Sequence, residues 1–283
     1  MWPVKRLLIA GFGDIARRAL PALERRFELR CGSRATGMDL DRPETLAGIE
    51  TDAVLHCAPP PASGETDSRT ANLLAALERG RILPARIVYV STSGVYGDCA
   101  GALVGEDRAP NPQSPRARRR ADAERQLAAW CAARAVALVV LRVPGIYAAD
   151  RLPLRHLRAG FPALRPEDDV YTNHVHAEDL AAIAVRALED DAPPGIYNAS
   201  DDSGLRMGDW LDLVADTVGL PRPARLPRAE LERRVPSELY SFMRESRRLD
   251  NARLKSVLGV RLAYPTVHEG LRDVRAAGAH EFA

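Results

Sequence analysis

The stretch IAGFGDIA, residues 9–16, joins an apolar segment to one with the residue spacing of a helix. Its two glycines and Ala16 form a G-x-G-x-x-A pattern, in which the first glycine permits a tight turn. The second glycine lets the backbone approach a pyrophosphate, and the following helix offers free N–H groups and the positive end of its dipole. The stretch therefore predicts a dinucleotide-binding loop with contacts from Gly11, Gly13, Asp14 and Ile15.

Short apolar runs alternate with longer amphipathic segments through the first half of the chain. Strands are predicted at 4–10, 27–31, 53–58, 86–91 and 136–143, and helices at 14–26, 68–79 and 114–133. Continuous apolar strands separated by helices are typical of a parallel sheet that is covered on both faces. The pattern predicts an α/β fold with a doubly wound, Rossmann-type sheet and a ligand cleft at the carboxyl ends of its strands.

The pattern becomes less regular after Pro144, where prolines separate predicted helices at 177–188, 207–218 and 250–258. We expect a dinucleotide-binding domain over residues 1–144. A small C-terminal α+β substrate lobe over residues 145–283 would be interleaved with the first domain and packed on it.

The end of the second predicted strand indicates which cofactor is preferred. A site for NAD(H) usually carries an acidic residue about 20 residues after the glycines, where it binds the ribose 2′-hydroxyl. Here Ser33 and Arg34 occupy that place, and no acidic residue follows before Asp39. Because an arginine suits a 2′-phosphate, the sequence favours NADP(H) over NAD(H).

Five further motifs follow one another in a fixed order along the chain. They are STSGVYGD (91–98), GEDRAPNPQSPRARRRADAE (105–124), LRVPGIYAADRLPL (141–154), HVHAEDLAAIAVRAL (174–188) and GIYNASDDSG (195–204). In this order they resemble the extended short-chain dehydrogenase/reductase superfamily, and within it the NAD-dependent epimerase/dehydratase-like proteins, over about residues 4–272.

The resemblance implies a set of site residues. Thr92, with Ser93 beside it, matches the hydroxyl residue that bonds the substrate oxygen. Further positions match the family's cofactor contacts: Asp39, Leu40, Ala58, Pro59 and Pro60. The family's Tyr-x-x-x-Lys pair, which exchanges the proton and holds the ribose, falls on Arg116 and Arg120. A guanidinium does not give up its proton near neutral pH, so this pair cannot work as an acid and base.

Three interpretations of the basic segment 116–120 follow. In the first, the protein is an oxidoreductase or epimerase acting on a small carbonyl or alcohol, with another proton donor: Tyr96, Tyr147, His174 or His176. Tyr147 is the preferred candidate, and Arg120 is still expected to hold the cofactor. In the second, the protein is a catalytically silent NADP(H)-binding sensor. The third, a nucleic-acid patch, is disfavoured because acidic residues follow and no aromatic residues are interleaved.

Composition adds further expectations. The formal net charge is +2 at pH 7, which offers no field to recruit nucleic acid or an anionic membrane. The four cysteines are widely spaced and predict neither a metal site nor a disulfide framework. No apolar run has the length of a signal peptide core or a membrane span, so we expect a cytoplasmic protein. We also expect a monomer or homodimer with a small-molecule substrate.

Overall fold

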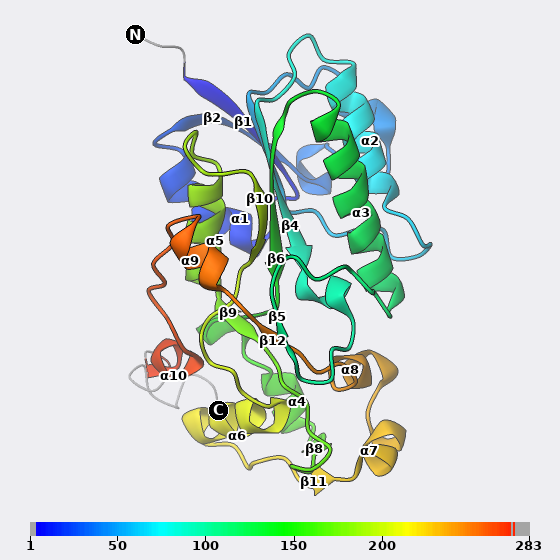
Figure 1. Cartoon of the computed structure of the whole chain (residues 1–283), viewed down its shortest axis with the longest axis vertical. Helices are drawn as coiled ribbons and strands as arrows, with labels where there is room; N and C mark the ends of the chain where they lie inside the picture. The colour runs from blue at the N-terminus through cyan, green and yellow to red at the C-terminus, as the bar shows by residue number, and fades with distance from the viewer. Residues whose placement is uncertain (1–3, 273, 275–283) are drawn as a thin grey trace.

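A six-stranded parallel sheet forms the centre of the molecule in the computed structural model, which describes residues 4–272 and 274 (Figure 1). Its order is β10-β6-β4-β3-β1-β2. The bounds are β1 (Lys5–Ala10), β2 (Phe27–Gly32), β3 (Ala53–His56), β4 (Arg86–Thr92), β6 (Ala137–Val143) and β10 (Gly195–Asn198). This confirms the predicted α/β fold with a doubly wound, Rossmann-type sheet.

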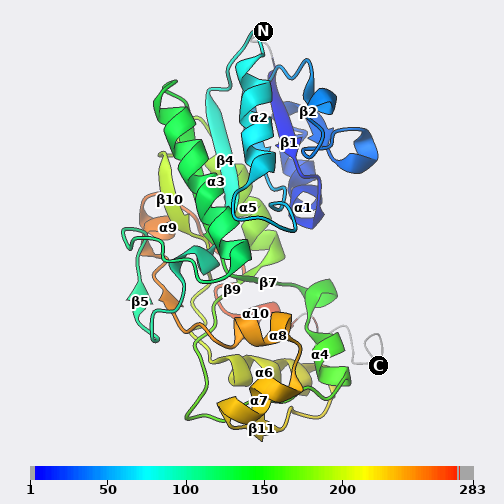
Figure 2. The ribbon, with the colours of Figure 1, turned by 90° about the vertical axis from the view of Figure 1, so that its right-hand side faces the viewer.

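Helices cover both faces of the sheet (Figures 1 and 2). On one face α1 (Asp14–Leu23) packs beside α5 (Ala177–Ala187), and on the other α2 (Ser68–Glu78) packs beside α3 (Pro115–Ala132). Each face has its own apolar core, the first around Leu7, Ile9 and Ile183, the second around Leu8, Leu73 and Leu127. Residues that alternate along β1 therefore divide between the two cores.

The sheet has one strand more than the sequence predicted. β10 pairs in parallel with β6, from Gly195 opposite Val139 to Asn198 opposite Arg142. Its four residues, GIYN, are too short to show a strand pattern, and they follow a pair of prolines. Because β10 and α5 come from the second half of the chain, the two halves are interleaved in space.

The rest of the chain forms a lobe at the carboxyl ends of the strands, below the sheet in Figure 1. Its core includes Leu157, Leu164, Trp210, Leu211 and Leu231. The helices of the lobe are α4 (Leu154–Arg158), α6 (Met207–Val218), α7 (Arg228–Arg234), α8 (Ser237–Phe242) and α10 (Val267–Gly270). The short helix α9 (Ala252–Ser256) instead packs beside the sheet next to β10, where Leu254 joins the core around Ile183. Paired short strands are β5 (Leu103–Val104) with β12 (Arg248–Leu249), β7 (Gly145–Tyr147) with β9 (His174–His176), and β8 (Ala163–Leu164) with β11 (Arg225–Leu226).

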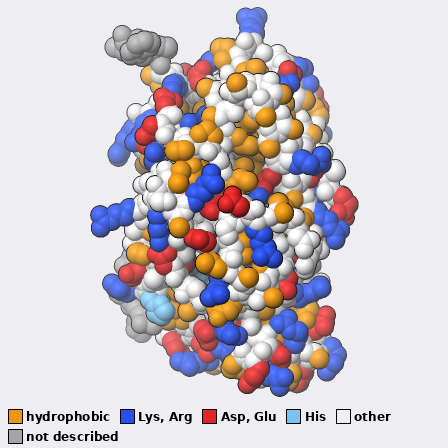
Figure 3. Space-filling view, viewed as in Figure 1, with side chains coloured by type: hydrophobic (Ala, Val, Ile, Leu, Met, Phe, Trp, Pro, Cys, Tyr) orange, Lys and Arg blue, Asp and Glu red, His pale blue; other side chains and the backbone are white. Residues whose placement is uncertain are grey.

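Short 3₁₀ turns complete the fold. They are η1 (Arg34–Thr36), η2 (Pro43–Leu46), η3 (Ser93–Tyr96) and η4 (Ala149–Arg151). Basic and acidic side chains are interspersed over the face shown in Figure 3, in line with the nearly balanced charge. In the described part of the chain, no helix is both long and apolar enough to cross a membrane.

Candidate active site

A cavity of about 200 Å³ lies at the carboxyl ends of the central strands, where the sheet meets the lobe. Its walls come from the glycine loop, the ends of β3, β4 and β6, α3, and the segment around β7. The lining residues are Gly11, Gly13, Asp14, Ile15, Ala16, Cys57, Val90, Ser91, Thr92, Arg116, Arg120, Val143, Pro144, Ile146 and Arg151. The structure thus gathers the predicted glycine-loop residues, Thr92 and both arginines around one cavity.

The two glycines of the loop are needed for different reasons. Gly11 has a φ of +94°, and a Cβ there would lie 2.3 Å from the backbone nitrogen of Ala58, so the fold itself requires glycine. At Gly13 a Cβ would meet nothing within 4 Å. The space beside Gly13 belongs to the cavity, next to the N-terminus of the ten-residue helix α1. This cradle fits the pyrophosphate of a dinucleotide.

A set of ion pairs fastens the glycine loop to the lobe. The Asp14 carboxylate accepts from Arg18 Nε at 3.0 Å and from Arg151 Nη1 at 2.8 Å. Arg18 also donates to Asp150 at 2.6 Å and to Glu178 at 2.6 Å. The single carboxylate on the cavity wall is therefore already paired with two arginines.

The residues predicted to meet the adenine ribose lie just beyond β2 and do not line the cavity. Ser33 begins η1, and its backbone N–H donates to the Thr36 hydroxyl at 2.8 Å. Arg34 is exposed, and its side chain makes no hydrogen bond or ion pair with any residue in the described part of the chain. Arg69, and more weakly the charge of Arg34, lower the pKa of the Asp41 carboxyl. Asp39 Oδ1 accepts from the backbone N–H of Asp41, and Leu40 is buried. The Arg34 guanidinium is thus available to a ligand.

Arginines hold the loop that follows β3, which contains the predicted contacts Ala58, Pro59 and Pro60. Arg69 Nη1 donates to the carbonyl oxygens of Pro59 at 3.0 Å and Pro60 at 3.2 Å. Arg120 Nη1 donates to the carbonyl oxygen of Ala58 at 3.3 Å. The backbone of Ala58 also lies against Gly11, so this loop packs directly on the glycine loop.

Thr92 ends β4 and lines the cavity, with its hydroxyl oxygen accepting the backbone N–H of Gly94 at 3.3 Å. The hydroxyl proton remains able to meet a ligand oxygen. Ser93 is buried in η3 and does not line the cavity. Ser91 does line it, and its hydroxyl donates to the buried carboxylate of Glu124.

Helix α3 presents Arg116 and Arg120 to the cavity one turn apart. Ser114 caps the helix by accepting from Ala117 N, and Pro115 occupies the first turn. Arg120 is buried, and its Nη1 also donates to the carbonyl oxygen of Val90 at 2.8 Å and the Tyr89 hydroxyl at 3.1 Å. Arg116 keeps access to solvent. Partial burial in the cleft, then the charges of Arg120 and Arg119, lower its pKa.

The candidate tyrosines lie behind the cavity wall. Tyr96 is fully buried and its hydroxyl donates to Asn198 Oδ1 at 2.8 Å. Tyr147 is 1% exposed, and its hydroxyl donates to the carbonyl oxygen of Thr266 at 3.2 Å in the core of the lobe. Burial raises the pKa of the Tyr147 hydroxyl. Its neighbour Ile146 lines the cavity instead, because successive side chains of a strand face opposite sides.

The candidate histidines also pack in the lobe, outside the cavity lining. His174 is buried with its ring 4.3 Å from that of Trp210, and burial lowers its pKa to about 3. His176 caps α5 by accepting from Glu178 N, and its ring lies 3.9 Å from that of Tyr264. Both histidines therefore act as packing residues in this structure.

Arg151, Cys57 and Ile146 also line the cavity, although no motif in the sequence predicted them. Arg151 lies in η4, and its side chain pairs with Asp14 at the cavity wall. Because the two residues are far apart in the sequence, no local pattern predicts this contact. Cys57 follows β3, and burial raises the pKa of its thiol to about 12. It is therefore a neutral wall residue rather than a nucleophile.

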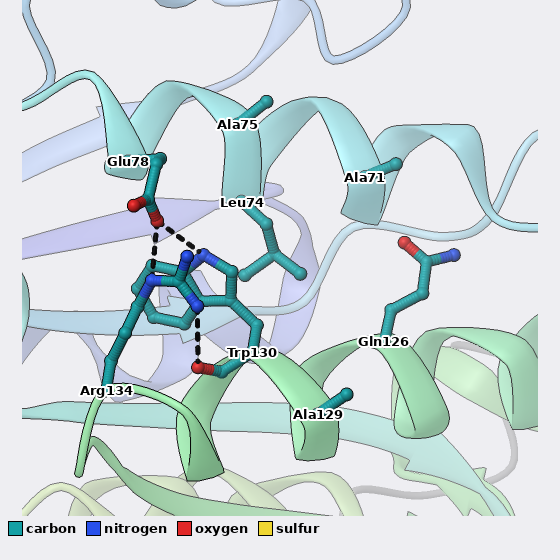
Figure 4. A pocket seen from close by; sticks show the side chains of 8 residues that line it. All are labelled: Ala71, Leu74, Ala75, Glu78, Gln126, Ala129, Trp130 and Arg134. Atoms are coloured by element: carbon teal, nitrogen blue, oxygen red, sulfur yellow. Dashed lines mark hydrogen bonds and ion pairs between the residues drawn. The ribbon is translucent and has the colours of Figure 1, made fainter.

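A second hollow, of about 520 Å³, lies on α2 and α3 away from the cleft (Figure 4). Its walls include the small side chains of Ala71, Ala75 and Ala129, and one end is closed by Glu78, which accepts from Trp130 Nε1 at 3.0 Å. It contains no residue of the glycine loop or of the Thr92 region. Among the described residues, no cluster of three His, Cys, Asp or Glu side chains could hold a metal ion.

Comparison with known proteins finds relatives in sequence and in fold. A reductase from Streptomyces sp., described as 3-diazoavenalumate denitrifying reductase, is 29% identical over 44% of this chain. The aligned stretch is 37% of that relative's own length. Solved structures with similar folds hold NAD or NADPH.

Two solved structures extend the likeness to nearly the whole chain. A conserved protein from Silicibacter pomeroyi DSS has a TM-score of 0.77 at 28% identity, covering 96% of this chain and 99% of its own. MoeE5 in complex with UDP-glucose and NAD has a TM-score of 0.74 at 21% identity, covering 98% and 100%. The sequence pattern of the NAD dependent epimerase/dehydratase family matches residues 18–200. This chain therefore belongs to the NAD dependent epimerase/dehydratase family.

Proposed function

We propose that the protein is an NADP(H)-dependent oxidoreductase or epimerase that acts on a small carbonyl or alcohol without a tyrosine as proton donor. The observation that carries the proposal is the cavity in which the Gly13 cradle, Thr92 and Arg116 come together. A nicotinamide dinucleotide bound there would supply or accept the hydride. A lobe of this size does not by itself exclude larger substrates, since a chain of matching length binds UDP-glucose.

The residues of the cavity suit a reaction that builds negative charge on a carbonyl oxygen. Thr92 has a hydroxyl donor, and Arg116 has a planar set of N–H donors, so both can bind that oxygen and stabilise its charge. Neither releases a proton near neutral pH. The proton that completes an alcohol would come from water, which reaches Arg116 at the open side of the cavity.

The preference for NADP(H) is part of the proposal and rests on Arg34. Its exposed guanidinium makes no hydrogen bond or ion pair in the described part of the chain, and the residue follows the strand next to β1. Arg34→Ala should weaken NADPH binding by about 10- to 100-fold, because one charge-assisted contact contributes about 1.5–3 kcal/mol. NADH binding should change by less than about threefold. Calorimetric titration of both cofactors checks this, and equal losses for both would contradict the assigned role.

A second candidate is a catalytically silent NADP(H)-binding sensor. The observation in its favour is that the tyrosines and histidines considered as donors all lie outside the cavity lining. On this view Arg116 and Arg120 would hold the cofactor in place, and no substrate would be turned over.

The two candidates are distinguished by following NADPH absorbance with a panel of aldehydes, ketones and oxo acids. Consumption with any member supports the oxidoreductase. If NADPH raises the melting temperature while no carbonyl is reduced, the sensor is the better account. If NADPH fails to bind, both are wrong.

A further inference from the structure

We propose that the substrate of this cleft carries an oxyanion, a carboxylate or a phosphate, which Arg116 binds beside Thr92. The inference rests on the proposed function for the cofactor, and it adds the chemical class of the second ligand.

Arg116 differs from the other arginines of α3 because its donors are unused. Arg118 donates to Glu65 at 3.2 Å, and Arg119 donates to the carbonyl oxygen of Gly64 at 2.7 Å. Arg120 donates to three oxygens at the ends of β3 and β4. The Arg116 side chain makes no hydrogen bond or ion pair with any residue described by the structure, although it lines the cavity. Because this side chain is exposed, water satisfies its donors until a ligand oxygen replaces it, so the guanidinium is available to a ligand in the cleft.

The charge on the cavity wall also favours an anion. Three guanidinium groups line it, from Arg116, Arg120 and Arg151, against one carboxylate, from Asp14. Asp14 is already paired with Arg18 and Arg151, so it leaves Arg116 uncompensated. Desolvation in the cleft, and then the neighbouring charges of Arg120 and Arg119, lower the pKa of Arg116, so its charged form is raised in free energy. An oxyanion would relieve that repulsion.

Arg116 comes from a different element than the residues proposed to hold the cofactor's phosphates. The pyrophosphate cradle is formed by Gly13 and the N-terminus of α1, whereas Arg116 projects from the first turn of α3. Arg120, one turn further along α3, is fixed to the ends of β3 and β4, and β4 carries Thr92. The planar donor set of arginine matches the paired oxygens of a carboxylate or phosphate.

The test titrates oxalate and, separately, inorganic phosphate into protein saturated with NADP⁺, so that the pyrophosphate cradle is already filled. We expect millimolar or tighter binding of at least one anion, and no binding of neutral acetamide. If oxalate binds more tightly than phosphate, the substrate carries a carboxylate. If phosphate binds more tightly, the substrate carries a phosphate. Arg116→Gln should weaken the preferred anion by about 10- to 100-fold, the size of one charged hydrogen-bonding contact. Arg116→Lys, which keeps the charge, should recover part of that loss.

Arg118→Gln is the matched control, since Arg118 lies on the same helix, is exposed and does not line the cavity. It should change the anion affinity by less than about threefold. The inference is overturned if neither anion binds the wild-type protein below about 10 mM, or if Arg116→Gln binds as tightly as wild type. If NADP⁺ itself fails to bind, the proposed function is wrong. The same titration on free protein, with the same variants, then still decides whether Arg116 forms an anion site.

Discussion

At the scale of single residues, the glycine loop shows how one motif contains two separate requirements. Gly11 is fixed by the fold, because its φ is positive and Ala58 lies against it. Gly13 has ordinary backbone geometry and open space where a side chain would be, so no contact within the described chain requires a glycine there. On the proposed function, the pyrophosphate of the cofactor would be what excludes a side chain at Gly13.

Substituting these glycines should separate folding from cofactor binding. Gly13→Ala is expected to fold with nearly wild-type stability but to weaken NADPH binding by at least about tenfold, because its methyl group enters the space for the pyrophosphate. Gly11→Ala should instead lose stability by more than about 1 kcal/mol, since the backbone of Ala58 must move. Thermal unfolding and NADPH titration of both variants check this. An unchanged NADPH affinity in Gly13→Ala would refute the placement of the cofactor.

At the scale of elements, α3 connects the catalytic side of the cleft to the sheet. Its Glu124 accepts from Arg142 of β6 at 2.7 Å and from Ser91 of β4, and all three side chains are buried. The Arg142 guanidinium also lies 4.7 Å from the ring of Tyr96. This buried network fixes the helix that carries Arg116 and Arg120 against the strand that ends in Thr92.

Removing the charge of Glu124 should therefore be costly. Glu124→Gln leaves the Arg142 side chain, which is 3% exposed, without a counterion. We expect a loss of about 3–5 kcal/mol in the free energy of unfolding, the usual result of breaking one side of a buried pair. Urea denaturation measures it. Glu230→Gln, which removes an exposed pair with Arg234, is the control and should cost less than about 1 kcal/mol.

Some elements could be predicted from the sequence with their bounds, whereas for others the orientation of the side chains could not. The helix that begins after Ser114 was predicted within a residue at each end, because a cap, a proline and the family pattern agree there. For β7, the sequence does not predict which side chain faces the cleft. In GIY, Ile146 and Tyr147 are both large and largely apolar, so the sequence does not say which one faces the cleft. Only the pairing of β7 with β9 decides it.

At the scale of the whole molecule, the lobe contains a buried acid that couples stability to pH. Asp201 follows β10, and its backbone N–H donates to the carbonyl oxygen of His174 in β9 at 2.7 Å. One carboxylate oxygen accepts from Ser203 N, whereas the other is buried without a hydrogen bond among the described residues. Burial, together with the charges of Asp202 and Asp179, raises its pKa from 3.8 to about 7.

The raised pKa predicts that stability falls as the pH rises. Between about pH 4 and 7 the folded protein keeps a proton on Asp201 that the unfolded chain releases, so folding loses up to about 4 kcal/mol across this window. Asp201→Asn should remove this dependence. Its unfolding free energy relative to wild type should be higher at pH 8 than at pH 5. Chemical denaturation of both proteins at these two pH values checks the sign, and an equal difference at both would contradict it.

The central claim is that the cleft supports hydride transfer without a titrating protein donor. It is tested most directly by the pH dependence of single-turnover NADPH oxidation with a reducible oxo acid. Burial raises the pKa of the lining Cys57 thiol to about 12, and no tyrosine or histidine of the described chain lines the cavity. We predict oxidation at a rate that shows no ionisation of a protein group between about pH 6 and 9. A rate that falls with an apparent pKa inside this range, or no oxidation with any oxo acid although NADPH binds, would contradict the claim.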